Sequence, residues 1–217
     1  NVELFNNSYK IDYFSSFMKI LLILSGIFVL LSSSKYIQII KINKIEYPIL
    51  VLSSMTGMMV MISSNDLILF YIGLELQSLA LYVLASFNRD NILSSESGLK
   101  YFVLSALSSG LLLYGCSLIY GFSGSTNFDL IAENVNKDSY GLTFGIIFII
   151  TGLAFKISAV PFHMWAPDVY EGSPTSVTIF FAILPKIAAL TVFIRILYVP
   201  FFNIIEQWQI IIVFLSI

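Results

Sequence analysis

The sequence of 217 residues contains only one cysteine, one histidine and 11% charged residues. The single Cys116 excludes a disulfide within the chain, and its apolar surroundings, LLLYGCSLIY, predict a small buried hydrophobe rather than a redox group. One histidine without a cluster of cysteines gives no zinc-site pattern. The formal net charge of −2 is too small to indicate a nucleic-acid or acidic partner.

Several catalytic and cofactor motifs are also missing from the sequence. No Gly-rich phosphate loop follows a strand pattern, and no nucleophile triad or set of cysteine ligands is present. We therefore expect no nucleotide, flavin, iron–sulfur cluster or metal to bind this chain, and no catalytic redox residue in it.

What the sequence has in excess is apolar residues. Hydrophobic types make up 58% of the chain, and the mean hydropathy is +0.89. Soluble globular domains carry about 25% charged residues, more than twice the fraction seen here. The composition predicts an integral membrane protein, and its long apolar runs predict an all-α, polytopic bundle of transmembrane helices.

Apolar runs of about 20 residues predict six membrane spans and part of a seventh, all in one transmembrane domain. They cover roughly residues 14–31, 48–64, 66–87, 99–121, 141–172 and 175–198, with a partial span over 208–217. The fifth is longer than one crossing requires, so we expect a discontinuous helix near Pro161. The polar segment 122–140 is expected to form a solvated loop.

Basic residues near the span ends indicate how the chain is oriented across the membrane. One side collects five of them and the other collects four: Lys35, Lys41, Lys44, Arg89 and Lys100 against Lys10, Lys19, Lys137 and Arg195. The dense KYIQIIKINK linker makes the first side the expected inside face.

Three ionisable residues fall well inside the predicted spans: Glu75, Lys156 and Lys186. A charge near the bilayer centre costs roughly 2.5–3.5 kcal/mol on insertion scales, so such residues mark ion or proton paths more often than they occur by accident. For any one of them the alternative is a structural ion pair or a snorkelling side chain. Three in one short chain, with Pro161 near Lys156 and Pro185 directly before Lys186, favour a proton path; Pro185 should also kink its helix.

His163 follows Lys156 by seven residues, which is two turns and the same face if the helix continues. An unperturbed imidazole titrates near pH 6.5, which suits a proton relay. The alternative is a hydrogen-bonded packing histidine.

The remaining polar and aromatic residues near span ends have simpler interpretations. Asp168 and Glu171 are expected to be loop or helix-end carboxylates. Snorkelling suffices for Lys19 and Arg195. Interfacial anchoring is expected for Trp165, Tyr198 and Trp208.

Four blocks of sequence between about residues 65 and 198 carry a family resemblance: IGLELQSLALYVLAS, SGLKYFVLSALSSGLLLYGCSLIYGFSG, FKISAVPFHMWAPDVYEGSPT and ILPKIAAL. They resemble the subunit 2 family of NADH:ubiquinone oxidoreductase (respiratory complex I), whose members are antiporter-like, proton-translocating membrane subunits. The third block is long and specific, and the mitochondrial and alphaproteobacterial members are the most similar.

The resemblance implies roles for the candidate residues. Glu75 matches the glutamate of the family's fifth helix, Lys156 the lysine of its broken seventh helix, with His163 just beyond it, and Lys186 the bridging lysine of its eighth. These residues would form a hydrated polar axis along the membrane midplane, with Glu75 and Lys156 as a modulating ion pair and Lys186 passing protons onward. Quinone reduction in other subunits, which would hold the flavin, iron–sulfur clusters and ubiquinone, would drive the transfer.

The resemblance also implies that the chain is partial. The family has about fourteen helices in two inverted repeats, and this chain matches the third to eighth and a piece of the ninth, which contain the first repeat. It begins with Asn1, has no targeting segment, and ends at Ile217 in an apolar run. We expect both ends to be cut or completed by a second chain with the missing helices.

Further expected partners are the other complex I subunits and the lipid bilayer. The expected location is the mitochondrial inner membrane, or alternatively a bacterial plasma membrane.

Two other functions remain open. A subunit of a multisubunit cation/proton antiporter shares the fold and the Glu–Lys pair, although the text HMWAPDVYEGSPT favours the complex I subunit. A purely structural membrane scaffold would use its buried charges only for pairing.

Overall fold

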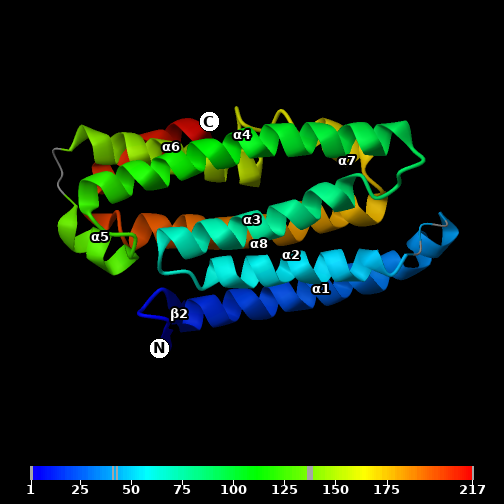
Figure 1. Ribbon diagram of the computed structural model, residues 1–217, viewed down its shortest axis with the longest axis horizontal. Helices are drawn as coiled ribbons and strands as arrows, with labels where there is room; N and C mark the ends of the chain where they lie inside the picture. The colour runs from blue at the N-terminus through cyan, green and yellow to red at the C-terminus, as the bar shows by residue number, and fades with distance from the viewer. Residues whose placement is uncertain (1, 41, 43, 136–138, 217) are drawn as a thin grey trace.

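The computed structural model describes residues 2–40, 42, 44–135 and 139–216. Within these residues the chain forms a helical bundle with a short antiparallel hairpin at its start (Figure 1). The elements are β1 (Val2–Leu4), β2 (Tyr9–Ile11), α1 (Tyr13–Ile39), α2 (Glu46–Ile62), α3 (Leu67–Ala85), α4 (Ile92–Ser123), α5 (Phe128–Asn134), α6 (Tyr140–Ile157), α7 (Ala166–Gly172), α8 (Thr175–Tyr198), the 3-10 turn η1 (Phe202–Ile204) and α9 (Ile205–Ser216).

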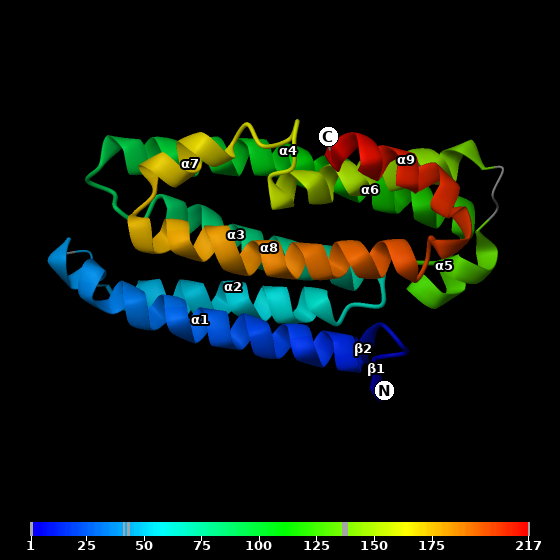
Figure 2. The same cartoon turned by 180° about the vertical axis from the view of Figure 1, so that it is seen from behind.

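The long helices run along the long axis of the molecule and lie in three tiers (Figures 1 and 2). Helices α1 and α2 form one side, α3 and α8 the middle, and α4 and α6 the other side, with α9 beside α6. Five of the described helices, α1, α3, α4, α6 and α8, are long and apolar enough to cross a membrane. The prediction of a polytopic, all-α membrane bundle is confirmed.

Polar side chains define where several helices begin. Asp12 caps α1 by accepting a hydrogen bond from the Ser15 backbone N–H at 2.7 Å, and Asp66 caps α3 in the same way through Ile68 and Leu69. Asn91 caps α4. Such caps satisfy N–H groups that the first helical turn leaves unpaired, which fixes the helix starts at polar residues between apolar runs.

Glycines allow α2 and α3 to pack backbone to backbone. A Cβ atom on Gly57 would lie 2.6 Å from the Gln77 nitrogen and 2.8 Å from the Gly73 carbonyl oxygen. A Cβ atom on Gly73 would lie 2.8 Å from the Met61 nitrogen. Since helices in lipid associate by close packing rather than by hydrophobic collapse, small residues at such a crossing hold the pair together.

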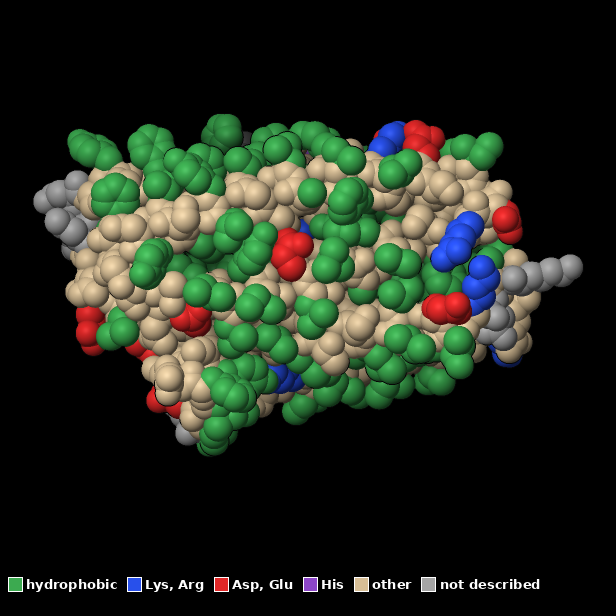
Figure 3. Space-filling view, viewed as in Figure 1, with side chains coloured by type: hydrophobic (Ala, Val, Ile, Leu, Met, Phe, Trp, Pro, Cys, Tyr) green, Lys and Arg blue, Asp and Glu red, His purple; other side chains and the backbone are tan. Residues whose placement is uncertain are grey.

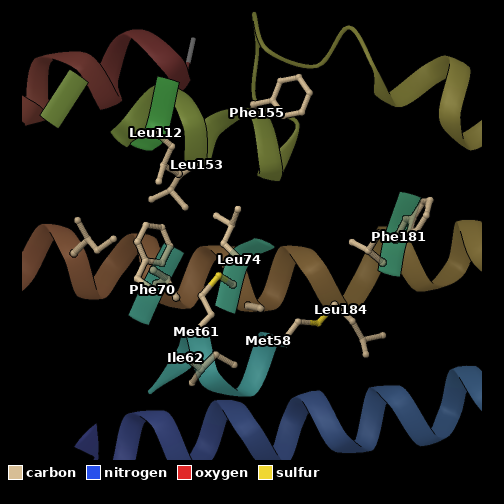
Figure 4. Packing of buried hydrophobic residues seen from close by; sticks show 14 of the residues in the cluster. Met58, Met61, Ile62, Phe70, Leu74, Leu112, Leu153, Phe155, Phe181 and Leu184 are labelled. Atoms are coloured by element: carbon tan, nitrogen blue, oxygen red, sulfur yellow. The ribbon is translucent and has the colours of Figure 1, made fainter. Parts of the chain in front are cut away.

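Apolar side chains from α2, α3 and α8 fill the interior between the tiers (Figure 4). Phe70, Leu74, Met58 and Leu184 are each at most 1% exposed. Many large apolar side chains also lie on the outside, and Figure 3 shows them spread over one face, with charged side chains at both ends of the molecule and a few near its middle. An outer surface of this kind suits contact with lipid or with other apolar helices.

The helix boundaries depart from the predicted spans at several points. Helix α4 begins at Ile92, within the linker expected before residue 99, while α8 has the bounds of the predicted span 175–198 and passes through Pro185 as one helix. The range 141–172 is divided into α6, a non-helical stretch and α7. The discontinuity predicted near Pro161 is confirmed.

The segment 122–140 is not wholly a solvated loop. It contains α5, whose Phe128 and Ile131 are fully buried, and the Asn65 side chain donates to Asp129 at 2.9 Å. The expectation was wrong here because two apolar residues three apart suffice to dock one helical turn on the bundle end. Residues 136–138, which include Lys137, and Lys41 lie outside the described residues.

Candidate functional site

Lys156 lies in the last turn of α6 with 5% of its surface exposed. Its ammonium donates to the hydroxyl of Ser78 on α3 at 2.9 Å and to the hydroxyl of Ser105 on α4 at 2.5 Å. Three helices therefore converge on one buried cation. Its position at a helix C-terminus also places the positive charge at the negative end of the helix dipole, which stabilises it.

The chain leaves the helix directly after Lys156. Ser158 ends α6 in the left-handed conformation, with φ 65°, and its N–H bonds the Ala154 and Phe155 carbonyls. The next helix starts at Ala166, and the Trp165 indole N–H donates to the Phe155 carbonyl at 2.9 Å. The break thus places the C-terminal end of α6 beside Lys156, and Trp165 is hydrogen-bonded to that helix end.

Glu75 on α3 interacts electrostatically with Lys156 but does not touch it. Among the described residues no ion pair joins the two groups, and the Glu75 Oε1 atom is buried without a hydrogen-bond partner. Ser78, three residues after Glu75 and on the same helix face, binds the ammonium instead. The direct ion pair implied by the family resemblance is absent from the described residues.

Lys186 is half-buried on α8, one residue after Pro185. Its ammonium lies 5.6 Å from the ring centroid of Tyr170 on α7. This distance allows a cation–π interaction, so a neighbouring ring holds this second intramembrane amine.

His163 lies in the non-helical stretch and is exposed. Its backbone carbonyl accepts a hydrogen bond from the Ala166 N–H at 2.9 Å. The expectation that His163 shares a face with Lys156 required a continuous helix, and α6 ends at Ile157, so that relationship does not hold.

Two of the three aromatic residues expected at the membrane surface are buried instead. Trp165 and Trp208 are 3% and 5% exposed, whereas Tyr198 is 57% exposed. The Trp208 indole donates to the Phe201 carbonyl. These tryptophans were assigned wrongly as interfacial anchors because closeness to a span end does not reveal whether a side chain faces inward.

Charged residues near helix ends are also held by partners. The buried Arg195 binds Asp12, so snorkelling does not describe it. The Lys19 ammonium donates to the Tyr9 hydroxyl at 2.7 Å. Asp168 is an exposed helix-end carboxylate, as expected, and pairs with Lys100 at 2.6 Å.

Sequence reasoning missed the hydroxyl groups that surround Lys156. Tyr82 donates to Ser105 at 2.8 Å, and Ser105 receives the ammonium from its other side. A signal was available on α3, because Glu75, Ser78 and Tyr82 follow one another at spacings of three and four residues in a mostly apolar helix. No comparable signal marks Ser105 among the many serines of α4.

The described residues include no group of three or more His, Cys, Asp or Glu side chains that could hold a metal ion. The arrangement can instead exchange protons, because a buried amine, a nearby carboxylate and a set of hydroxyls can each donate or accept one.

Comparison with known proteins places this chain in a family. Residues 64–217 match the family model described as NADH:quinone oxidoreductase/Mrp antiporter, transmembrane part. NADH-quinone oxidoreductase subunit N of Pelagibacter ubique is 75% identical over the whole chain, which covers 46% of that protein.

Solved structures agree with this match. A chain of respiratory complex I from Thermus thermophilus superimposes with a TM-score of 0.76 and 32% identity, over 87% of this chain and 41% of that one. A chain of the Mrp complex from Dietzia gives a TM-score of 0.72 and 27% identity, over 88% of this chain and 36% of that one. The chain spans less than half the length of the curated relatives it matches. It belongs to the NADH:quinone oxidoreductase/Mrp antiporter family of membrane proteins.

Proposed function

We propose that this chain is part of a proton-translocating membrane subunit of an NADH:quinone oxidoreductase, corresponding to subunit N and to the first of two inverted repeats. The observation that carries the proposal is Lys156, a buried amine at a helix break that is held by two hydroxyls and interacts with Glu75. A buried cation without a direct carboxylate partner can gain and lose a proton more readily than one locked in an ion pair.

In this proposal Lys156 stores a proton, Glu75 modulates its charge, and Lys186 passes the proton onward. A negative charge on Glu75 favours the ammonium form of Lys156, and loss of that charge favours proton release. His163, exposed beyond the helix break, would exchange protons with solvent at the edge of the site.

Energy for transfer would come from quinone reduction elsewhere in the complex, and the flavin, iron–sulfur clusters and quinone would belong to other subunits. The similarity to subunit N of Pelagibacter ubique over the whole chain supports this assignment. The alternative, a cation/proton antiporter subunit, is represented by the Mrp complex chain, which is 27% identical.

The curated relatives are bacterial, which favours a bacterial plasma membrane; a mitochondrial inner membrane stays a prediction. The missing helices would come from the rest of the same protein or from a second chain.

Lys156→Met in the full-length protein of the assembled complex tests the proposal. Methionine keeps the approximate length and volume of the side chain but cannot hold a proton. We expect NADH-driven proton translocation to fall at least tenfold in proteoliposomes, since proton-transfer groups typically contribute 10²–10⁴-fold. Lys100→Met is the matched control, because Lys100 is an exposed cation paired with Glu96 and Asp168.

Unchanged translocation in Lys156→Met would contradict the proposal. Loss of assembled complex with normal activity in the remainder would support the structural scaffold instead. Co-purification of flavin- and iron–sulfur-containing subunits with this protein would separate the oxidoreductase from an antiporter complex.

A further inference from the structure

A groove between α2, α3 and α4 opens on the outside of the bundle, at the end where α3 finishes and α4 begins. Its volume is about 700 Å³, which lies within the usual range for ligand pockets, roughly 300–1,000 Å³. The basic residues at this end make it the expected inside face of the membrane. In Figure 3 basic side chains lie beside apolar ones at the same end. The groove therefore begins at the depth where lipid headgroups lie.

The walls of the groove are apolar and face outward. Four of the lining side chains are between 46% and 67% exposed: Ile49 on α2, Val83 on α3, and Leu99 and Phe102 on α4. Along α4 the lining extends from Ser95 to Phe102, which is roughly 10 Å at 1.5 Å per residue. A groove with walls of this kind and length suits the upper part of a lipid chain.

The floor of the groove is formed by aromatic rings that their neighbours hold in place. Tyr82 and Phe87 line the groove and are each 8% exposed. The Tyr82 ring packs edge-on against Phe102 with the centroids 5.5 Å apart, and its hydroxyl donates to the buried Ser105. The Phe87 ring packs edge-on against Tyr47, also at 5.5 Å. Because these rings are fixed, the groove is preformed and need not open to take a ligand.

Two cations at the groove lack a countercharge in the part of the chain that the structure describes. Lys44, just before α2, and Arg89, between α3 and α4, are exposed and line the groove, and no ion pair joins either to a described residue. By contrast, Lys100 at the same end pairs with two carboxylates, those of Glu96 and Asp168. The positive charge of Lys44 and Arg89 is therefore available to a ligand.

One carboxylate also lines the groove. Glu46 lies in the first turn of α2, where the positive end of the helix dipole stabilises its charge. It forms no ion pair with Lys44 or Arg89. Asp90 follows Arg89 in sequence but does not line the groove. Two cations and one carboxylate give the groove a net charge of +1, which a headgroup with a single negative charge would balance.

We propose that this groove binds an anionic phospholipid with one phosphate, such as phosphatidylglycerol. The phosphate binds Arg89 through two parallel hydrogen bonds and Lys44 as a point charge. The glycerol hydroxyls of the headgroup donate to Glu46, and one acyl chain lies along the wall from Val83 to Phe102. Basic pockets between membrane helices on the inner side are the kind of site that binds anionic headgroups. The proposal does not rest on the proposed function, because lipid binding needs no proton transfer.

Photo-crosslinking in proteoliposomes tests the assignment. The assembled complex with the full-length protein is reconstituted with phosphatidylglycerol that carries a diazirine in one acyl chain, and mass spectrometry identifies the labelled peptides. We expect label on the parts of α3 and α4 that line the groove. Unlabelled phosphatidylglycerol should suppress this labelling, whereas phosphatidylcholine and phosphatidylethanolamine, whose headgroups carry no net charge, should not.

A double variant, Lys44→Gln with Arg89→Gln, removes the groove's cations. Labelling should fall roughly tenfold or more, since each cation near the membrane surface contributes about fivefold to binding of an anionic lipid. Lys35→Gln is the matched control, because Lys35 is an exposed cation at the same end that does not line the groove. It should be labelled like the wild type.

A further variant tests the apolar wall separately from the charges. Val83→Trp fills the groove and leaves both cations in place, so labelling should fall in the assembled complex. Leu79→Trp is its control, because Leu79 is 56% exposed one turn earlier on α3 and does not line the groove.

Unchanged labelling in the double cation variant or in Val83→Trp overturns the assignment. Equal suppression by the lipids without net charge overturns it as well. An unlabelled groove in the assembled complex would mean that a partner subunit covers it, which also overturns the assignment.

Discussion

Arg195 on α8 and Asp12 at the start of α1 form a buried ion pair that closes one end of the bundle. One guanidinium nitrogen, Nη2, donates to both carboxylate oxygens of Asp12, at 2.6 and 2.8 Å. The Arg195 side chain is 4% exposed and that of Asp12 is 28% exposed. Asp12 also caps α1 through Ser15, so one carboxylate joins a helix start to a helix 183 residues away in sequence.

We expect Asp12→Asn to destabilise the protein by about 2–3 kcal/mol. Asparagine still caps α1 but leaves Arg195 buried without a countercharge, and the loss stays below that of a fully buried pair because Asp12 is partly solvated. Thermal unfolding of the purified protein in detergent measures the change. Glu3→Gln is the control, since Glu3 forms an exposed pair with Lys10 at the same end. An equal unfolding temperature for Asp12→Asn and wild type would contradict the prediction.

The same ion pair predicts a dependence of stability on pH. Burial raises the pKa of Asp12, but the hydrogen bonds from Ser15 and the charge of Arg195 outweigh it and hold this pKa below its ordinary value of 3.8. A carboxylate with a lowered pKa stabilises the fold fully above that ordinary value, and the contribution is lost as the pH falls through the lowered one. The difference in unfolding temperature between wild type and Asp12→Asn should be constant from pH 8 to 5 and shrink below about pH 4. A difference as large at pH 2 as at pH 7 would contradict this.

Ser105→Ala should slow proton translocation more than Ser78→Ala. Ser105 accepts from Lys156 at 2.5 Å and from Tyr82 at 2.8 Å, whereas Ser78 accepts from the ammonium at 2.9 Å and donates to the Leu74 carbonyl. Removing a hydrogen bond to a charged group costs about 1.5–3 kcal/mol, which corresponds to rate effects of about tenfold or more. Initial rates of NADH-driven acidification in proteoliposomes check the order. Ser117→Ala, at an exposed position on α4, should match wild type.

Gly57→Val should prevent stable packing of α2 on α3. Its side chain would begin 2.6 Å from the Gln77 backbone nitrogen, and neither helix backbone can move without losing the crossing at Gly73. The amount of the protein in assembled complex, measured after native electrophoresis, should fall severely. Gly110→Ala on α4 is the control, because a Cβ atom there has no neighbour within 4 Å. Normal assembly of Gly57→Val would show that the close approach is not required.

Much of the fold could be predicted from the sequence. The apolar runs predict a bundle of membrane helices, and the excess length of 141–172 with Pro161 inside it predicts the broken helix that the structure contains. The N-terminal hairpin and α5 could not be predicted in this way. Both depend on hydrogen bonds between residues far apart, such as those linking Asn65 to Asn7 and to Asp129.

The candidate site, like the fold, could be predicted from the sequence only in part. The sequence by itself identifies Glu75, Lys156 and Lys186, since a charge inside an apolar span is costly wherever it points. Only the tertiary structure decides what surrounds them: Ser78 and Ser105 bind Lys156 across 78 and 51 residues of sequence, and Trp165 packs inside the bundle instead of at its surface. The physical reason is that a membrane helix is apolar on nearly every side. Its sequence therefore fixes its depth in the bilayer, while contacts with neighbouring helices determine which face turns inward.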